Sequence, residues 1–499
     1  MRLRWSSVAS AVVLSLALGV RIAGAATIAV NTAGDAAPPV SGDGGCTLRE
    51  AIDNSNADAD STGGDCAAGA GADVIAFAVG VGHVTIRPVA ALPAITGGVT
   101  IDGASQPGYM GSPIVELDGS LAGPSDGLRL QATSPSTIRA LVVNSFQDTG
   151  IYVILATADV VEDCYVGTDV SGTVAKPNGV GVLSNNTWVR RNLISGNAVY
   201  GAEVVDFNHY TENRVGTDVT GSVALPNGIG FFVTGVGNRI GDPSPGYGNV
   251  ISGNSGDGVA MGSSADANVI QSNAIGVDHT GALPLPNGGR GILLFEHANR
   301  HLIGGPAAGE ANAIAYNGGD GVEVQAPAAE NDITANSIHD NGGLGIRLTR
   351  EPGSPNLPPG NHGQPAPTLT AAASGGGTTT VAGTLASAPS TSYRIDFYSS
   401  PRCDPSRFGE GERYLGSQTV LTNAAGTAAF TAAFATDLPS LSAYTATSTD
   451  IQVPLARGDT SEFSNCFGGP IDIPIDERAL LALILLLAIV GFARLRSPG

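Results

Sequence analysis

The chain repeats one phrase three times, and this repetition limits the folds that it can adopt. The copies are VGTDVSGTVAKPNG from Val166, VGTDVTGSVALPNG from Val215 and IGVDHTGALPLPNG from Ile275. A second phrase alternates with the first: NLISGN from Asn192, NVISGN from Asn249, and the weaker copies NAIAYN from Asn312 and NSIHDN from Asn336. Repeats at such intervals are typical of a solenoid, in which each unit buries its apolar face against the next.

Short strands of β-branched residues, separated by Gly, Asn, Asp and Pro, follow one another from residue 74 onward. Cutting the chain at the repeated phrases gives coils of about 22 to 33 residues, a length that suits one turn of a parallel β-helix. The positions expected to point inward are Val, Ile, Leu and Ala, as a filled interior requires. The sequence therefore predicts an all-β protein with a right-handed parallel β-helix over residues 74–350.

Asparagine recurs at the turns between the predicted strands. Asn tolerates left-handed backbone geometry, and stacked side-chain amides can hydrogen-bond from coil to coil. We interpret these residues as a structural ladder, with ligand-binding positions as the alternative. The predicted ladder residues are Asn192, Asn197, Asn249, Asn254, Asn312, Asn317, Asn336 and Asn341.

The first 25 residues resemble a secretory signal peptide. Arg2 and Arg4 precede an apolar stretch from Val8 to Val20, and the small residues Ala23-Gly24-Ala25 supply a cleavage site. The alternative is an uncleaved anchor, for which the apolar stretch is short. Export permits disulfide bonds.

The chain has five cysteines. Proximity in the sequence pairs Cys46 with Cys66, and Cys403 with Cys466 across one C-terminal domain. Cys164 is left over and is predicted to be a small buried residue on a strand.

The segment from Cys46 to Cys66, CTLREAIDNSNADADSTGGDC, predicts a short capped helix. Thr47 and Glu50 have the spacing of a capping box, and Leu48, Ala51 and Ile52 share one face. Because the first coil of a solenoid exposes its core and its strand edges, we expect residues 26–73 to form an N-terminal cap. The segment resembles the CSLREA-type region of bacterial secreted β-helix proteins, with Thr47 in place of the usual Ser. That resemblance implies a pectate-lyase-like fold from a non-enzymatic branch.

A Pro/Gly-rich stretch, 351–367, is predicted to be a linker to a small domain over 368–467. In that domain Tyr393, Ile395 and Phe397 alternate with Arg394, Asp396 and Tyr398, as in a half-buried strand. Several further strands predict an immunoglobulin-like β-sandwich.

The last segment, 471–499, contains an apolar run from Ala479 to Ala493, followed by Arg494 and Arg496. As a helix the run would rise about 22 Å, short of the ~30 Å hydrocarbon core. It resembles bacterial C-terminal sorting tails of the IPTL-CTERM and PEP-CTERM type, although Ile475-Asp476 replaces Thr-Leu. A plain transmembrane anchor is the alternative. Both interpretations put the body of the protein outside the cytoplasm and a membrane contact at 479–493.

Few residues of the chain are candidates for catalysis or for metal binding. The acidic Asp169, Asp218 and Asp278 of the repeated phrase could bind calcium, but the copies fall on alternate coils, so these residues should lie about 10 Å apart. One calcium ion needs its oxygens at about 2.3–2.6 Å, and we therefore interpret the aspartates as turn residues. Glu323 lies in GGDGVEVQA, which partly resembles a calcium-binding nonapeptide repeat but has no tandem copy.

Two further observations concern a binding surface. His279 and Arg290 lie in one predicted coil and could face one groove. The only Trp after the signal peptide is Trp188, and this poverty in aromatic residues argues against a dedicated polysaccharide binder. No cofactor is predicted, and calcium remains a hypothesis for a stabilised scaffold.

The net charge of −20 disfavours nucleic acid as a partner. We therefore predict an exported cell-surface protein with a structural or adhesive role, which displays its loops to a surface or matrix component, glycan or protein. The alternative is a polysaccharide lyase or glycoside hydrolase that acts in a groove along the β-helix. Asp, Glu, Arg or His from adjacent coils in a concave groove would favour the enzyme, and a flat face of Asn, Ser and Thr would disfavour it.

Overall fold

The computed structural model describes residues 24–469 except 156–157, 264, 355, 440–441 and 452–456. Nearly all of the predicted signal peptide lies outside the described residues, and so does the whole predicted tail, including the apolar run 479–493.

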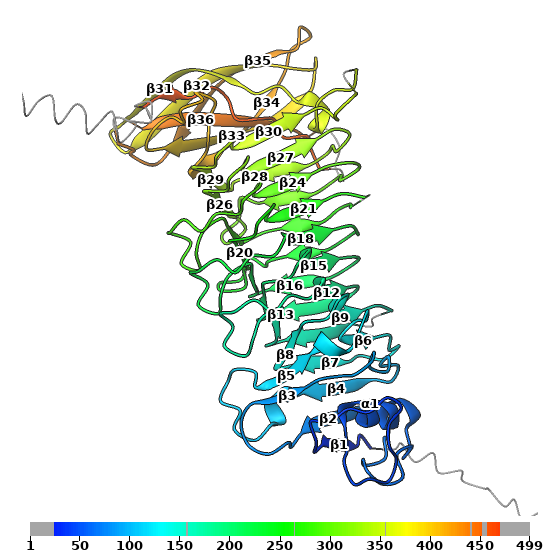
Figure 1. Cartoon of the computed structure of the whole chain (residues 1–499). Helices are drawn as coiled ribbons and strands as arrows, with labels where there is room; N and C mark the ends of the chain where they lie inside the picture. The colour runs from blue at the N-terminus through cyan, green and yellow to red at the C-terminus, as the bar shows by residue number, and fades with distance from the viewer. Residues whose placement is uncertain are drawn as a thin grey trace, which may run out of the picture.

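Three parallel sheets form the body of the molecule, and from β4 onward each turn of the chain contributes one strand to each sheet (Figure 1). The right-handed parallel β-helix predicted from the repeats is confirmed. Sheet A has 11 strands, sheet B has 10 and sheet C has 9. Neighbouring strands in such sheets lie about 4.8 Å apart, so the body is a rod whose length follows the number of coils.

The strands of sheet A are β1 (Thr27–Val30), β2 (Asp73–Phe77), β4 (Val99–Asp102), β7 (Thr137–Arg139), β10 (Asp159–Glu162), β13 (Thr187–Arg190), β16 (His209–Thr211), β19 (Arg239–Ile240), β22 (Val269–Ile270), β25 (Leu302–Gly304) and β28 (Asp332–Thr334). Those of sheet B are β3 (Val84–Ile86), β5 (Val115–Asp118), β8 (Leu141–Asn144), β11 (Tyr165–Val166), β14 (Leu193–Ile194), β17 (Arg214–Val215), β20 (Val250–Ile251), β23 (Ala274–Ile275), β26 (Ala313–Ala315) and β29 (Ser337–His339). Those of sheet C are β6 (Leu128–Leu130), β9 (Thr149–Val153), β12 (Val180–Ser184), β15 (Tyr200–Val204), β18 (Ile229–Val233), β21 (Val259–Met261), β24 (Ile292–Leu294), β27 (Val322–Gln325) and β30 (Ile346–Thr349). Two 3-10 turns, η1 (Gly103–Ser105) and η2 (Gly119–Leu121), follow β4 and β5.

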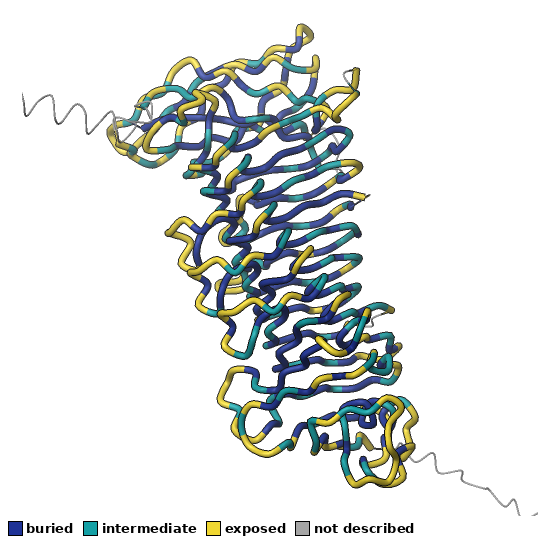
Figure 2. Tube along the Cα trace, viewed as in Figure 1, coloured by how far each residue is buried: buried dark blue, intermediate teal, exposed yellow. Residues whose placement is uncertain are grey.

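The interior of the β-helix is a stack of aliphatic side chains. Ile240, Ile270 and Ile303 occupy matching positions on successive strands of sheet A, and each is fully buried. Figure 2 shows buried strands along the rod, with exposed residues gathered in the loops beside β20 and at the two ends. Because a one-residue slip would turn every inward side chain outward, differences in coil length have to fall in the loops.

The N-terminal end is closed by the helix α1 (Leu48–Ala57). Its capping box is confirmed, since the Thr47 side chain accepts from the Glu50 N–H and the Glu50 carboxylate accepts from the Thr47 N–H. Leu48, Ala51 and Ile52 are buried in the core of the β-helix. The first strand β1 lies within the segment predicted to be a cap, because α1 is inserted between the first and second strands of sheet A.

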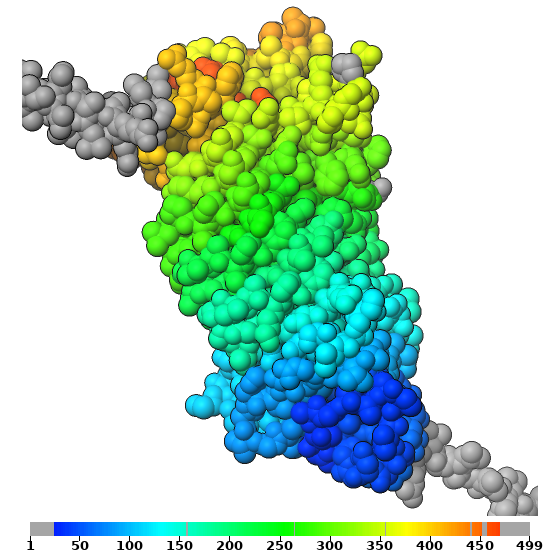
Figure 3. Space-filling view, in the orientation of Figure 1, coloured from blue at the N-terminus to red at the C-terminus, as the bar shows by residue number. Residues whose placement is uncertain are grey.

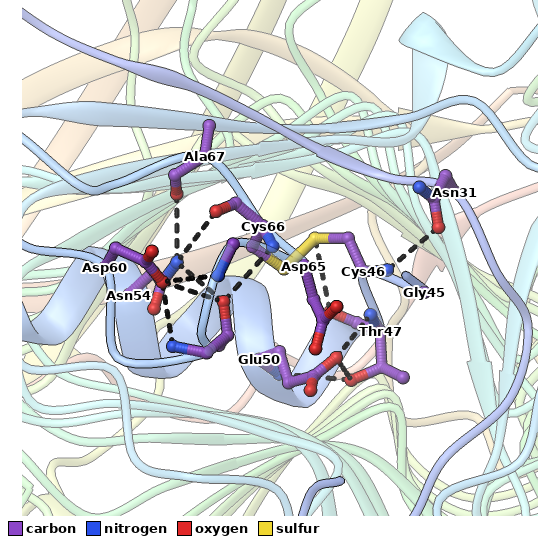
Figure 4. The surroundings of a disulfide bond; sticks show 12 residues. Asn31, Gly45, Cys46, Thr47, Glu50, Asn54, Asp60, Asp65, Cys66 and Ala67 are labelled. Carbon is purple, nitrogen blue, oxygen red and sulfur yellow. Dashed lines mark hydrogen bonds between the residues drawn. A yellow bond between two sulfur atoms is a disulfide. The ribbon is translucent and has the colours of Figure 1, made fainter. Parts of the chain in front are cut away.

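Both predicted disulfides are confirmed: Cys46–Cys66 and Cys403–Cys466. Cys46–Cys66 ties the residue before the capping box to the loop after α1 (Figure 4). Next to it, Asn54 donates to the carbonyl of Ala67 at 3.0 Å, so helix and loop are joined by both covalent and polar contacts.

Asparagine ladders run along the three corners of the β-helix. In the first two, each Asn donates from Nδ2 to Oδ1 of the Asn one coil further on, at 2.9–3.1 Å. The first ladder, between sheets B and C, is Asn178, Asn197, Asn227, Asn254, Asn287, Asn317 and Asn341. The second, between sheets A and B, is Asn192, Asn213, Asn249, Asn273, Asn312 and Asn336. The structure thus places all eight predicted asparagines in these two ladders.

The third ladder, between sheets C and A, has no counterpart in the sequence prediction. It consists of Asn208, Asn238, Asn268, His301, Asn331 and Asn361. His301 accepts the N–H of Asn268 through Nδ1, and burial lowers its pKa to about 3, so the imidazole is neutral. A neutral ring with an unprotonated Nδ1 can take the place of an Asn oxygen.

Cys164 occupies the place before Asn192 in the second ladder, because its N–H donates to Asn192 Oδ1 at 2.9 Å. It is fully buried and lies in the turn between β10 and β11, so the prediction of a strand position is wrong. The turn position follows from the register, which aligns residue 164 with the corner asparagines.

The C-terminal domain is a β-sandwich of two antiparallel sheets. One sheet contains β31 (Thr368–Gly375), β32 (Thr378–Ala386) and β35 (Thr427–Phe434), and the other contains β34 (Arg413–Leu421), β33 (Ser392–Ser400), β36 (Ala443–Asp450) and β37 (Phe467–Gly468). The two sheets share a core that includes Ile395, Phe397 and Phe430.

The sandwich is seated directly on the last coils of the β-helix (Figure 3). Each terminal strand donates a backbone N–H to it: Ile333 to Thr460 Oγ1 at 2.9 Å, Ile338 to Gly411 O at 2.8 Å, and Leu348 to Glu462 Oε1 at 2.9 Å. The edges of all three sheets are thereby covered, which removes a template for aggregation.

This contact changes two predictions. Strand β33 is buried on both faces, with Asp396 and Tyr398 at 0% and 2% exposure, because its second face covers the end of the β-helix. The predicted linker 351–367 also packs against that end. Within it, η3 (Asn361–Gly363) places Asn361 Oδ1 where it accepts the N–H of Asn331 at 3.1 Å.

The first prediction concerns the ladders. Asn254→Leu should lower the free energy of unfolding by at least about 2 kcal/mol, because the buried Asn227 loses the acceptor of its backbone N–H and of one Nδ2 hydrogen, and the Val215 carbonyl loses one of its donors. The control is Asn185→Leu, a half-buried turn position, where a change within about 0.5 kcal/mol is expected. Equal effects in chemical unfolding would contradict the ladder.

The second prediction concerns Glu410, which ends the first ladder by accepting the N–H groups of Asp340 at 2.7 Å and Asn341 at 3.1 Å. Burial, together with the nearby carboxylates of Asp404 and Asp340, raises the pKa of Glu410 to about 7. Between about pH 4.5 and 7 the folded chain holds this proton and the unfolded chain has lost it. The contribution of Glu410 to stability therefore falls as the pH rises through this window.

Thermal unfolding measured from pH 5 to 8 should show this loss of stability. In Glu410→Gln the loss over the same pH range should be smaller, by roughly 3 kcal/mol or less. Glu412→Gln, a half-buried carboxylate two residues further on, is the matched control. If both variants follow the pH profile of the unmodified chain, Glu410 does not carry the effect.

Candidate functional site

The three repeated phrases form three similar loops between sheets B and C. In each loop the aspartate of the repeated phrase accepts a hydrogen bond from the hydroxyl group two residues further on. The donors are Ser171 to Asp169 at 2.7 Å, Thr220 to Asp218 at 2.7 Å, and Thr280 to Asp278 at 2.6 Å. The same oxygen accepts backbone N–H groups four and five residues on. The three aspartates close their own turns.

The protonation state of two of them follows from these bonds. Burial would raise the pKa values of Asp218 and Asp278, but the hydroxyl and N–H donors outweigh it and hold both below the ordinary value. Each carboxylate is therefore ionised and already occupied by donors of its own loop.

The loops leave alternate coils, since β11, β17 and β23 alternate with β14 and β20 in sheet B. They nevertheless contact one another across the intervening coils. The Val219 N–H donates to Gly172 O, and the His279 N–H donates to Gly221 O, both at 2.9 Å. The result is a stack of loops that projects from the side of the rod beside β20 (Figure 1).

A groove of about 390 Å³ lies beside this stack. We call it the sheet B groove, and its lining residues are Arg191, Glu212, Asn213, Arg214, Gly246, Gly248, Val250 and His279. Arg214 and Val250 lie side by side on β17 and β20 and form the floor. Arg191, Glu212 and the glycines come from the turns between sheets A and B, and His279 comes from the third loop.

The charged groups of the sheet B groove differ in their partners. Arg191 pairs with Glu162 at 2.7 Å and with Asp163 at 2.8 Å, and these contacts, the one with Asp163 foremost, raise its pKa. Arg214 has no carboxylate oxygen within 4.0 Å among the described residues. His279 shares a hydrogen bond with the Ser222 hydroxyl through Nδ1 at 3.1 Å.

The residues predicted to face a groove are only partly brought together. His279 lines the sheet B groove, but Arg290 lies beside sheet C and pairs with Glu323 at 2.7 Å. The same arginine lies 3.7 Å from Asp257. An arginine in contact with Glu323 makes this carboxylate a poor calcium ligand, because the two cations would compete for it. Trp188 is exposed on sheet A, where the centroid of its ring lies 4.2 Å from the centroid of the His209 ring.

A second charged cluster surrounds Glu116 on sheet B. Burial would raise the pKa of Glu116, but donors from Lys176, Asn144 and Thr85 lower it to about 2. Lys176 Nζ lies 2.7 Å from this carboxylate, and His83 Nε2 lies 3.1 Å from it. The carboxylate is saturated by protein donors, so we interpret the cluster as an ion-pair network that joins the first loop to β5.

Across the described ranges, no group of three or more His, Cys, Asp and Glu side chains is arranged to hold a metal ion. Within the same part of the chain, no helix is long and apolar enough to cross a membrane.

No protein-family model and no curated protein sequence matches the chain. Among solved structures, the Dettilon tailspike protein is similar over 78% of this chain and 88% of its own, with 12% identity and a TM-score of 0.33. The enzymatically active domain of tailspike protein 4 from bacteriophage CBA120 is similar over 80% of this chain and 64% of its own, with 10% identity and a TM-score of 0.24.

The third prediction tests the role of the loop aspartates. Asp218→Ala should lower stability by about 1 kcal/mol, since it removes the acceptor of Thr220 and of two backbone N–H groups. Asp218→Asn, which keeps one acceptor oxygen, should cost less. Chelation with EDTA should leave the Tm unchanged, and a fall in Tm would instead support the calcium-stabilised scaffold.

Proposed function

We propose that the chain is an exported cell-surface protein whose β-helix holds an extended glycan in the sheet B groove. Its role would be adhesion or display without turnover of the ligand. The observation that carries this proposal is the groove itself, which is lined by Arg191, Glu212, Arg214 and His279 from three coils.

The lining of the groove supports a ligand rich in hydroxyl groups. Guanidinium groups, a carboxylate and an imidazole offer both donors and acceptors. The wall at Gly246 carries no side chain and has open space beside it, so a polymer can approach the backbone closely there. Sugar polymers are extended, and a groove beside a stack of loops suits such a shape better than a closed pocket would.

The balance between adhesion and catalysis depends on the carboxylates. Glycoside hydrolysis commonly uses two of them, one on each side of the scissile bond. Among the described residues that line the groove, Glu212 is the only carboxylate. The second candidate function, a polysaccharide lyase or glycoside hydrolase, is favoured by the presence of Glu212 and His279 in one groove.

The proposed location outside the cytoplasm is supported by the two disulfides, which fit an oxidising compartment. The CSLREA-type resemblance, the signal-like N-terminus and the sorting-type tail point the same way. A surface or matrix glycan is the proposed partner, and residues 479–493 would supply the membrane contact before any processing.

The fourth prediction is that the purified chain binds a polysaccharide in a glycan screen and leaves it uncut, as scored by binding and by the release of reducing ends or unsaturated products. Val250→Trp should abolish binding, because it fills the floor of the groove. Val269→Trp, at a half-buried valine on the outer face of sheet A, is the control and should bind normally. Cleavage would favour the enzyme, and binding that survives in Val250→Trp would place the ligand elsewhere.

A further inference from the structure

We propose that the sheet B groove selects acidic glycans, and that Arg214 binds a carboxylate or sulfate group of the polymer. This inference rests on the proposed function and adds the chemical class of its ligand. Arg214 differs in its surroundings from two other arginines of the β-helix, Arg139 and Arg190.

Outward-facing arginines of the β-helix commonly have a carboxylate on the neighbouring strand. Arg139 lies in register with Asp102 and Glu162 and bonds Asp102 at 2.7 Å. Arg190 lies in register with Glu162 and bonds it at 2.8 Å. The repeat thus places a compensating charge one coil away.

Arg214 lacks such a neighbour. Its register partners are Leu193 on β14 and Val250 on β20, both apolar. No carboxylate oxygen among the described residues lies within 4.0 Å of it, although the chain contains 44 Asp and Glu residues. Arg214 is half-buried, lies between two apolar side chains and has no ion pair there, so its positive charge favours an anionic partner.

The side chain of Arg214 is also held in place. It packs under the second loop, where a Cβ added to Gly221 would come within 3.1 Å of its Nε. A positioned guanidinium presents a planar fork that matches two oxygens of a carboxylate or sulfate group. Less side-chain entropy then remains to be lost when the ligand binds.

The other ionisable groups of the groove also influence how tightly an anionic ligand binds. Arg191 is already compensated by Glu162 and Asp163, so Arg214 is the main cationic site. His279 offers Nε2, which has no hydrogen bond to a described residue, as a second donor. Glu212 opposes an anionic ligand and should weaken its binding.

The fifth prediction uses two hexasaccharides, a hexa-uronate and its carboxyl-reduced neutral counterpart, with Kd measured by calorimetry at about 0.15 M ionic strength, where long-range repulsion by the acidic chain is screened. The uronate should bind more tightly than the neutral hexamer. Arg214→Gln should weaken uronate binding about tenfold or more and leave neutral binding unchanged. Glu212→Gln should strengthen uronate binding severalfold.

The matched control is Arg239→Gln. Arg239 is an exposed arginine on sheet A that also lacks a carboxylate oxygen within 4.0 Å among the described residues, and its replacement should not change binding. The binding of a sulfated hexamer is measured in parallel. If Arg214→Gln weakens its binding as much as it weakens uronate binding, sulfate groups bind at the same site. Because Glu212→Gln acts in the opposite direction, the test does not depend on one variant remaining stable.

Two results would overturn the inference while leaving the proposed function intact: equal affinity for the acidic and neutral hexamers, or uronate binding that Arg214→Gln does not change. Failure of the chain to bind any glycan in the screen would overturn both proposals.

Discussion

The hydrogen bond from one corner asparagine to the next is the interaction on which the rest of the structure depends. Each ladder amide both donates and accepts, so a position such as Asn254 satisfies a backbone carbonyl, Val215 O, and the side chains on either side. These bonds fix the height and the register of every coil at its corners. The aliphatic core then needs only the right volume, because the turns already determine which side chains point inward.

Much of this design can be read from the sequence, and what cannot depends on register. The asparagines of the ISGN phrases are visible because their neighbours repeat. Asn178, Asn227 and Asn287 are the next-to-last residues of the three longer phrases, yet the loop inserted before each one hides its equivalence to Asn197 and Asn254. The third ladder has no constant neighbours, and at His301 a different residue supplies the acceptor. A pattern of single residues at variable spacing becomes recognisable only once the coils are aligned.

The sheet B groove was beyond sequence prediction for a related reason. The position of Arg214 between Leu193 and Val250 follows from the lengths of two different coils. His279 reaches the groove because loops from alternate coils contact each other across the coil between them. The sequence therefore predicted His279 at a groove but assigned it the wrong arginine. The second face of β33 was missed similarly, since the alternation of Tyr393 to Tyr398 does not reveal what covers Asp396.

Confining length variation to the loops has a consequence for how such a protein can change over time. The corner asparagines carry the stability, and the loops beyond them carry the groove. An insertion between β23 and Asn287, in the loop that carries His279, alters the groove wall without moving the ladder, whereas a substitution at the corner disturbs the coils above and below it. Apart from Asn213, which belongs to both the second ladder and the groove lining, recognition and stability therefore lie on separate residues. New ligand specificities can arise by lengthening or exchanging loops while the rod itself is inherited unchanged.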